Sequence, residues 1–361
     1  MTEQPSDTSR AWVEIDLGAL RRNGAAIARH AGAPLLPMVK ADAYGLGAVA
    51  AVRALEPHEP WGYGVATVDE GRALRDAGST RPILVFTPLL PADFRAAHAA
   101  RLTPVLGDPT AIARWSETGA PWHLGIDTGM ARAGVRWDRV GDVASLLAAL
   151  PPEGACTHFH SATDAASVRQ QRERFATAVA ALPIRPRILH AENGAAVEHL
   201  EERSALDLVR PGIFLYGVSS GHGARIAPEP VVNVHARVVE VRGIAAGDIV
   251  SYDATWRAEG PRRIATLAIG YADGYRRALS NRGVVLLNGV RARVAGLVTM
   301  DMTMVDATET DCAPGDVATL VGNAGDDTLT VADVAERAQL SPYELLTGLR
   351  ARLRRVYREA A

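Results

Sequence analysis

The sequence almost lacks lysine. Of its 39 lysine and arginine residues, 38 are arginine, and Lys40 is the one lysine. A solvated surface charge tolerates arginine in place of lysine, but a site that needs a primary amine does not, because guanidinium stays protonated and is a poor nucleophile. Lys40 lies in the stretch LLPMVKADAYGLGA, between an apolar run and a Gly-rich run. We therefore predict a chemical role for this amine.

Other scarce features exclude several classes of protein. The two cysteines, Cys156 and Cys312, form no CxxC pair and no disulfide framework, which fits a reducing, cytoplasmic location. No apolar run approaches the ~20 residues of a membrane span, and the polar start MTEQPSDTSR is unlike a signal peptide. The net charge of −2 gives no basic surface for nucleic acid, and the 10 histidines show no zinc-like spacing. We expect a cytoplasmic protein that has no metal site and binds neither nucleic acid nor membrane.

Short apolar runs alternate with longer amphipathic segments through the first two thirds of the chain. Each run is bounded by Pro, Gly or Asp, which is typical of strands buried on both faces. The runs cover residues 35–40, 62–68, 81–86, 102–106, 122–127, 155–160, 187–192 and 207–213. These strand–helix repeats predict an α/β fold with an N-terminal (β/α)8 TIM-like barrel over residues 10–229, after a disordered lead-in over 1–9.

The pattern changes after residue 229. Segments rich in Val, Thr and Gly alternate in period two and are separated by turn signals such as AAGD and LNGV. This pattern predicts a C-terminal antiparallel β domain over residues 230–361. A terminal helix is expected to begin at Ser341 and to continue through the Arg-rich tail, with Pro342 at its first position. A strand expected over 11–16 is compatible with pairing in either domain.

Polar side chains follow several predicted barrel strands. Catalytic residues of such barrels lie at the carboxyl ends of the strands, where Lys40, His158, Asn193 and Arg210 fall. A desolvated lysine amine condenses with an aldehyde, and pyridoxal phosphate is the commonest cofactor of that kind. Barrels bind phosphate with backbone N–H groups after the last strands. Gly212 and Ile213 lie at the end of the last predicted run, 207–213, so the sequence predicts a pyridoxal phosphate site.

Seven motifs resemble, in the expected order, those of the alanine racemases, which are fold-type III pyridoxal phosphate enzymes. They are VKADAYGLG, IDTGMARAG, HFHSATD, VRPGIFLYG, SYDATW, IGYADGY and LVTMDMTMVD. The resemblance covers about residues 11–358. It implies an isomerase (EC 5.1.1.1) that interconverts L-alanine and D-alanine and supplies D-alanine for cell-wall peptidoglycan. It also implies a homodimer with shared active sites.

The same resemblance implies roles for individual residues. Lys40 holds the cofactor as a Schiff base and is the acid/base on one face of the substrate, and Tyr252 is the acid/base on the other face. Arg210 lies against the pyridine nitrogen, and His158 lies near the ring. The cofactor phosphate is held by Tyr44, Asn193, Gly194, Gly212 and Ile213. The substrate is placed by Arg132, Met300 and Tyr271.

Four positions depart from the family pattern: Leu46, Gly125, Gly194 and Thr299. Gly125 stands where many members have a carbamylated lysine that braces the substrate-binding arginine, so another group must brace Arg132. Three alternatives stay open: a broad-specificity amino-acid racemase, a fold-type III decarboxylase and a non-catalytic cofactor carrier. A cation at Arg210 argues against the decarboxylase, since it leaves the pyridine ring a weaker electron sink. Tyr252 and the β domain argue against the carrier.

Overall fold

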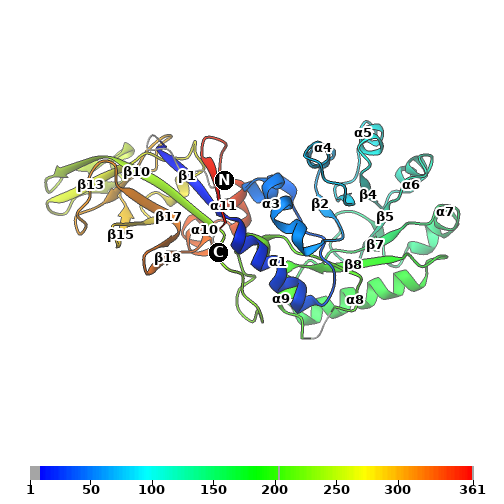
Figure 1. Cartoon of the computed structure of the whole chain (residues 1–361). Helices are drawn as coiled ribbons and strands as arrows, with labels where there is room; N and C mark the ends of the chain where they lie inside the picture. The colour runs from blue at the N-terminus through cyan, green and yellow to red at the C-terminus, as the bar shows by residue number, and fades with distance from the viewer. Residues whose placement is uncertain (1–8, 202–203, 360–361) are drawn as a thin grey trace. The chain divides into compact units, whose positions relative to one another are not determined.

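The computed structural model describes residues 9–201 and 204–359, which form two compact units (Figure 1). The barrel unit holds residues 20–43 and 48–229, and the β unit holds residues 9–19, 44–47 and 230–359. Apart from residue 9, the lead-in expected over 1–9 lies outside the described residues. The units differ from the expected division in two short segments, 10–19 and 44–47, which belong to the β unit.

Parallel strands form the sheet of the barrel unit. In order of pairing they are β2 (Tyr63–Val65), β3 (Ile83–Val85), β4 (Thr103–Leu106), β5 (His123–Asp127), β7 (Gly154–Cys156), β8 (Ile188–Asn193) and β9 (Leu208–Arg210), with β6 (Val135–Arg136) beside β5. Segment 35–39 closes the gap between β9 and β2 without forming a regular strand. The Leu36 amide donates to Val209 O at 2.8 Å, and the Val39 amide donates to Gly64 O at 2.9 Å. The barrel predicted from the sequence is confirmed in this nearly closed form.

Helices cover the outside of the barrel sheet (Figure 1). They are α1 (Leu17–Ala31, of which residues 20–31 belong to this unit), α3 (Ala48–Leu55), α4 (Val68–Asp76), α5 (Asp93–Ala99), α6 (Pro109–Ser116), α7 (Ala144–Ala149), α8 (Ala165–Ala180) and α9 (Gly194–Glu198). The α8 helix begins after Asp164, whose carboxylate caps the Ala166 amide. It buries Val168, Phe175 and Val179, as their helical spacing predicts.

Apolar side chains from the barrel strands form part of the core. Leu36, Leu84, Ile188 and Leu208 form one buried cluster, with Phe86 packed beside it. Burying each such side chain contributes roughly 1.5–3 kcal/mol to folding. This apolar cluster holds the strands together, and it thereby fixes the positions of the side chains at their carboxyl ends.

A largely antiparallel sheet forms the β unit. Its order is β18 (Asp327–Leu329), β17 (Val317–Ala324), β14 (Val284–Leu287), β15 (Val290–Val294), β16 (Thr303–Asp306), β13 (Arg262–Leu267), β10 (Val232–Ile244), β1 (Ala11–Asp16) and β19 (Arg354–Arg358). Val13 in β1 lies opposite Val234 in antiparallel register and beside Arg355 in parallel register. The strand over 11–16, which the sequence allowed in either domain, therefore pairs inside the β unit.

The end of the chain differs from the expected terminal helix. After α10 (Val331–Ala338), helix α11 (Pro342–Thr347) begins as expected, with Ser341 as its N-cap and Pro342 at its first position. It ends at Thr347, however, and the Arg-rich tail forms β19. Val356 is fully buried there. Pairing with β1 and burial of Val356 outweigh the helical propensity of the arginines.

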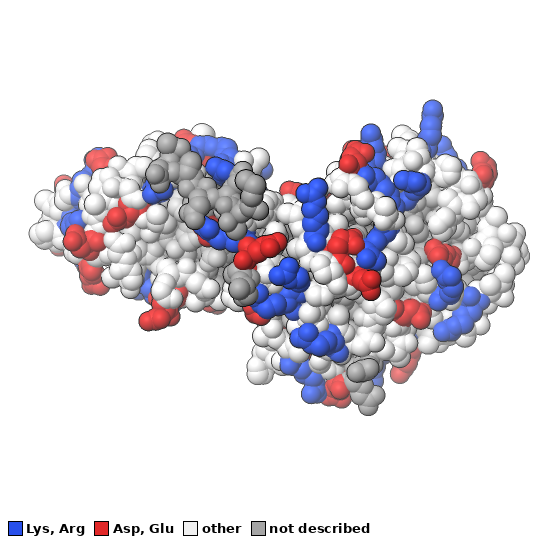
Figure 2. Space-filling view, in the orientation of Figure 1, with Lys and Arg blue, Asp and Glu red and all other residues white. Residues whose placement is uncertain are grey.

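Charges of both signs are mixed over the face drawn in Figure 2, without a large patch of one sign. Across residues 9–201 and 204–359, no helix is long and apolar enough to cross a membrane. The same residues contain no group of three or more His, Cys, Asp or Glu side chains placed to hold a metal ion.

Candidate active site

Lys40 opens a left-handed turn at the carboxyl end of the closing segment 35–39. It is the first residue of α2 (Lys40–Gly45), in which Ala41, Asp42 and Ala43 have φ of 52–53° and Tyr44 has φ of 58°. A left-handed conformation costs about 1–2 kcal/mol for each residue that carries a Cβ. Such strain persists only where the surroundings impose it, and it is concentrated at functional sites.

The carboxylate of Glu70 stabilises the start of this turn. Its Oε1 accepts the Ala41 amide at 2.8 Å, and its Oε2 accepts the Ala66 amide at 2.7 Å, just after β2. At the other end of the turn, Asp42 Oδ1 accepts the Ala48 amide at 2.7 Å. Glu70 therefore ties the residue that follows Lys40 to the end of a neighbouring strand.

Residues 44–47 continue this turn within the β unit. Arg355 donates to Gly45 O at 2.9 Å, and the Tyr357 hydroxyl donates to Leu46 O at 3.1 Å. Tyr44 is buried, with its ring centroid 6.0 Å from that of Tyr343. Burial raises the pKa of Tyr44, so its hydroxyl is neutral at pH 7 and able to donate a hydrogen bond.

Neighbouring charges tune the amine of Lys40. The side chain reaches solvent, but the protein atoms around the amine desolvate it and lower its pKa. The Arg132 and Arg210 cations also lower the pKa of Lys40, while the Glu70 carboxylate raises it. A lowered pKa increases the fraction of neutral amine, which is the form that acts as nucleophile and base.

Arg210 is a buried cation at the end of β9. Its guanidinium donates to Thr157 O at 2.7 Å, to Ala191 O at 2.9 Å and to His190 Nδ1 at 3.0 Å. Among the described residues, no carboxylate forms an ion pair with it. Burial lowers the pKa of Arg210, yet a guanidinium remains charged at neutral pH. The site thus contains a fixed positive charge held only by neutral acceptors.

Two further histidines extend this network. His190 Nε2 lies 2.8 Å from His123 Nδ1. Because Arg210 can only donate, His190 accepts at Nδ1 and carries its hydrogen on Nε2, which fixes the tautomers of both rings. Burial and the Arg210 cation lower the pKa of His123 to about 3 and that of His190 well below its usual range. No catalytic role was predicted for these histidines, although both lie in predicted barrel strands, over 122–127 and 187–192.

Arg132 and His158 line a small cavity together with Arg210. The cavity has a volume of about 110 Å³ and is also bounded by Gly125 and Met130. His158 Nδ1 lies 3.4 Å from Arg210 Nη2. Desolvation, followed by the Arg210, Arg132 and Lys40 cations, lowers the pKa of His158.

The guanidinium of Arg132 is exposed and has no hydrogen-bond partner within the described part of the chain. Its donors are therefore available to an anionic ligand. A larger cavity of about 790 Å³ lies between α8 and α9 and contains none of the predicted site residues.

The predicted phosphate-binding residues of the barrel unit lie close together. Asn193 caps α9 by accepting the Ala196 amide at 3.0 Å. A Cβ on Gly194 would lie 3.5 Å from the amide nitrogen of Gly212, so these two backbone segments are neighbours. Gly212 directly precedes the short 3-10 helix η3 (Ile213–Tyr216). The amides at the start of such a helix have no acceptor within it and are available to an anion.

Tyr252 lies in the β unit on a strained turn. It begins η4 (Tyr252–Ala254), and its neighbours Ser251, Asp253 and Ala254 have φ of 69°, 60° and 48°. The Ser251 hydroxyl donates to Leu297 O at 2.7 Å. The Tyr252 side chain is 69% exposed. A costly backbone that presents an exposed tyrosine is typical of a functional position.

The structure thus divides the predicted residues between the two units. Tyr44, Tyr252, Tyr271 and Met300 lie in the β unit. The loop that carries Tyr271 is hydrogen-bonded to the loop that carries Met300. The remaining predicted residues lie in the barrel unit: Lys40, Arg132, His158, Asn193, Gly194, Arg210, Gly212 and Ile213.

Comparisons with known proteins agree over nearly the whole chain. Residues 15–220 match the family model "Alanine racemase, N-terminal domain", and residues 231–357 match "Alanine racemase, C-terminal domain". The alanine racemase of Carboxydothermus hydrogenoformans is 37% identical over 367 residues, covering 96% of this chain and 99% of the relative.

Solved structures agree as well. The alanine racemase of E. faecalis superposes with a TM-score of 0.91 at 28% identity, over 97% of this chain and 98% of that one. The alanine racemase of Bartonella henselae, solved with covalently bound pyridoxal phosphate, superposes with a TM-score of 0.89 at 30% identity, over 97% and 99% of the two chains. The chain therefore belongs to the alanine racemase family.

Proposed function

We propose that the chain interconverts L-alanine and D-alanine by moving the Cα proton between two bases, Lys40 and Tyr252, with pyridoxal phosphate as cofactor. Family membership supports the racemisation of alanine. The observation that carries the proposal is the placement of the only lysine on a strained turn, where burial and then the Arg132 and Arg210 cations lower its pKa.

The residues of the barrel unit fit the cofactor. Lys40 supplies the amine that would bond to its aldehyde carbon. Arg210 is a buried donor that pairs with no carboxylate of the described residues, and it would face the pyridine nitrogen. The neighbouring backbone at Gly194 and Gly212, with Asn193 beside it, would hold the phosphate. When bound, the pyridoxal ring withdraws electrons from the substrate Cα and makes its proton more acidic.

Two bases are needed because racemisation removes a proton from one face of Cα and returns it to the other. The Lys40 amine would exchange the proton on one face, and the Tyr252 hydroxyl would exchange it on the other. A tyrosine with the ordinary pKa of ~10 is a weak base at pH 7. We propose that neutral His158, next to the Arg210 cation, links Tyr252 to that charge and favours its phenolate. Arg132 would bind the substrate carboxylate.

A second copy of the chain would supply Tyr252 to each active site. Nine large apolar side chains are strongly exposed in the described chain, and five of these lie between residues 249 and 302 of the β unit: Ile249, Tyr252, Tyr271, Met300 and Met302. Such a concentration of exposed apolar groups favours a protein interface. We infer a homodimer whose two active sites each combine residues of both chains. We expect it in the cytoplasm, with its D-alanine used for peptidoglycan, a role typical of the family.

Separate incubation of the purified protein with L-alanine, L-serine, L-lysine and L-arginine tests the substrate assignment. Chiral chromatography then measures each D-isomer. Fast turnover of alanine alone is the expected result. Comparable rates with the basic amino acids would replace this proposal with a broad-specificity racemase, and release of CO2 would indicate a decarboxylase.

A further inference from the structure

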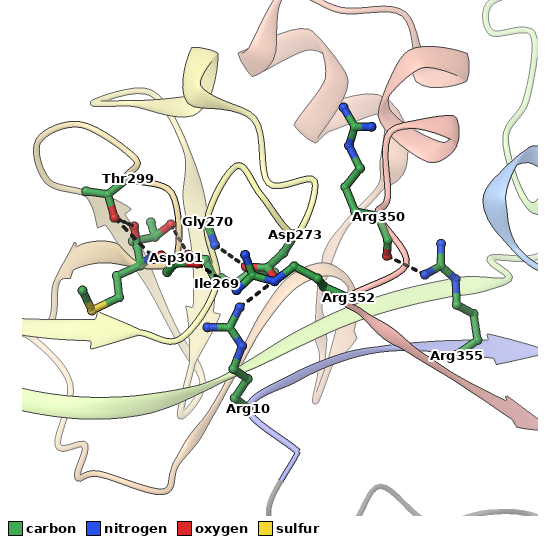
Figure 3. Close-up of polar contacts among 11 residues, drawn as sticks. Arg10, Ile269, Gly270, Asp273, Thr299, Asp301, Arg350, Arg352 and Arg355 are labelled. Atoms are coloured by element: carbon green, nitrogen blue, oxygen red, sulfur yellow. Dashed lines mark hydrogen bonds and ion pairs between the residues drawn. The ribbon is translucent and has the colours of Figure 1, made fainter.

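A buried carboxylate, Asp273, joins the segments that precede two neighbouring strands, β1 and β19, to the loop that carries Tyr271 (Figure 3). Its side chain is only 1% exposed. Its Oδ1 accepts Arg10 Nη2 at 2.7 Å and lies 3.2 Å from Arg352 Nε, while its Oδ2 accepts the Gly270 amide at 2.9 Å. Arg10 directly precedes β1 and Arg352 closely precedes β19, and these two strands pair with each other.

Arg352 also contacts a second loop. Its Nη2 lies 2.8 Å from Asp301 Oδ1, and Asp301 is the residue after Met300. One guanidinium therefore bridges the loop of Tyr271, through Asp273, and the loop of Met300, through Asp301 (Figure 3). A planar guanidinium is suited to such a bridge because its donors point in fixed, divergent directions.

The backbones of the two loops are in direct contact. The Tyr271 amide donates to Thr299 O at 3.0 Å, and the Ala272 amide donates to Met300 O at 3.0 Å. A Cβ on Gly270 would lie 2.3 Å from Thr299 O, so only glycine allows this approach. Tyr271 and Met300 nevertheless remain exposed, at 40% and 53%. Two solvent-facing side chains thus project from loops whose backbones are hydrogen-bonded to each other.

We infer that Asp273, Arg352 and Asp301 form a clamp that positions Tyr271 and Met300 at the substrate edge of the active site. The inference rests on the proposed function, in which these two side chains help to place alanine. Buried ion pairs are weak evidence for stability, since apolar packing serves that purpose at least as well. A carboxylate that receives cations from the segments before two paired strands, and also the amide of its own loop, is better suited to fixing one loop geometry.

The clamp has a distinct kinetic consequence. Tyr271 and Met300 would contact the bound amino acid, whereas Lys40 and Tyr252 move the proton. Loosening the two loops should therefore raise KM for alanine more than it lowers kcat. The cofactor residues of the barrel unit should be unaffected. A residue that only stabilises the fold would instead reduce activity along with the amount of folded protein.

The test compares Arg352→Met with Arg291→Met in the intact holoenzyme. Both arginines are about half exposed, and Arg291 forms an ion pair with Asp327 elsewhere in the β unit. We expect Arg352→Met to raise KM about tenfold with kcat changed by less than about threefold. Deuterium exchange at the amides of Tyr271 and Ala272 should quicken about tenfold. The Arg291→Met control should leave KM, kcat and this exchange at wild-type values.

Two isosteric variants, Asp273→Asn and Asp301→Asn, separate the two halves of the clamp. Each should raise KM, with Asp273→Asn the larger effect because it weakens two arginine contacts. Asp301 is 47% exposed, so Asp301→Asn provides a folded variant if Asp273→Asn does not fold. Wild-type KM and exchange in Arg352→Met would overturn the inference, as would faster exchange with an unchanged KM. A wild-type chain that does not racemise alanine would refute the proposed function, while the exchange rates would still decide whether the clamp exists.

Discussion

Glu70 accepts a hydrogen bond from the amide of Ala41, the residue that follows Lys40, at 2.8 Å. This contact joins the strained turn to the end of β2 and sets a carboxylate near the site's only lysine. Glu70 thus acts on Lys40 in two ways, through the backbone conformation and through charge.

Replacement of Glu70 by glutamine should shift the pH dependence of the reaction. Glu70 occupies the third helical position in the capping box with which Thr67 begins α4, and glutamine suits that position and retains one acceptor. Glutamine lacks, however, the charge that raises the pKa of Lys40. The neutral amine should then persist to lower pH, so the limb of kcat/KM that reports Lys40 should move towards acid. The matched control is Glu229→Gln, at a half-exposed carboxylate that pairs with Arg22. Identical pH profiles for Glu70→Gln and wild type would contradict this role.

Mixing two inactive variants should restore activity if each active site combines two chains. Lys40→Ala and Tyr252→Phe should each lower kcat by at least about 10²-fold, the usual contribution of a positioned acid or base. After dissociation and random reassociation, half the dimers would be mixed, and each would hold one intact site. About a quarter of wild-type activity is therefore expected from the symmetry of such a dimer. Activity no higher than that of the separate variants would show that Lys40 and Tyr252 act within one chain.

Replacement of Arg210 by glutamate should strengthen electron withdrawal by the cofactor ring. A carboxylate favours a protonated pyridine nitrogen, whereas the fixed guanidinium leaves it unprotonated. We expect a new long-wavelength absorption band during turnover with alanine, together with slower racemisation. Because Arg210 bonds to three neutral acceptors in the barrel, the variant should also be less stable, and its folded fraction must be measured alongside by circular dichroism. A folded variant without the new band would refute this account of Arg210.

Acidification should destabilise the barrel unit through its buried histidines. The pKa of His123 is about 3 in the folded chain, compared with about 6.5 when unfolded. The unfolded chain therefore binds more protons between these values, so the free energy of unfolding falls as pH drops below 6.5. Between pH 6.5 and 5 the loss is about 2 kcal/mol for this one histidine.

Urea denaturation at pH 7, 6 and 5 measures this slope, and His123→Leu should reduce it. Equal slopes in wild type and His123→Leu would show that other groups control the acid sensitivity. The His123→Leu variant also retains Arg210 and its contacts with Thr157 and Ala191, so its cofactor absorbance should remain close to that of wild type.

Much of the fold follows from patterns that the sequence displays locally. Seven of the eight predicted barrel strands overlap observed strands, and α8 buries the apolar stripe that its helical spacing predicts. The remaining predicted strand, over 35–40, closes the barrel without forming a regular strand. The Arg-rich tail was predicted wrongly as helix. Its strand β19 exists because β1, more than 300 residues earlier in the chain, provides a pairing edge. Such long-range pairing leaves little trace in local propensity.

The features of the site also divide into those that the sequence predicts and those that depend on contacts between distant segments. The reactive residues could be identified because their chemistry is rare in this chain, as with Lys40, or because motifs carry them. The left-handed conformation of residues 41–44 could not be foreseen, since non-glycine residues adopt it singly and not in a run of four. The partnership of Arg210 with His190 and His123 was missed because it depends on which strand ends meet inside the barrel.

The single lysine has a practical consequence for measurement. Any amine-directed reagent can label only two groups in this chain, the N-terminal amine and Lys40. A cofactor bonded to Lys40 would shield one of them. The extent of labelling, read from the intact protein mass, would then report the fraction of occupied active sites without a substrate or an enzymatic assay.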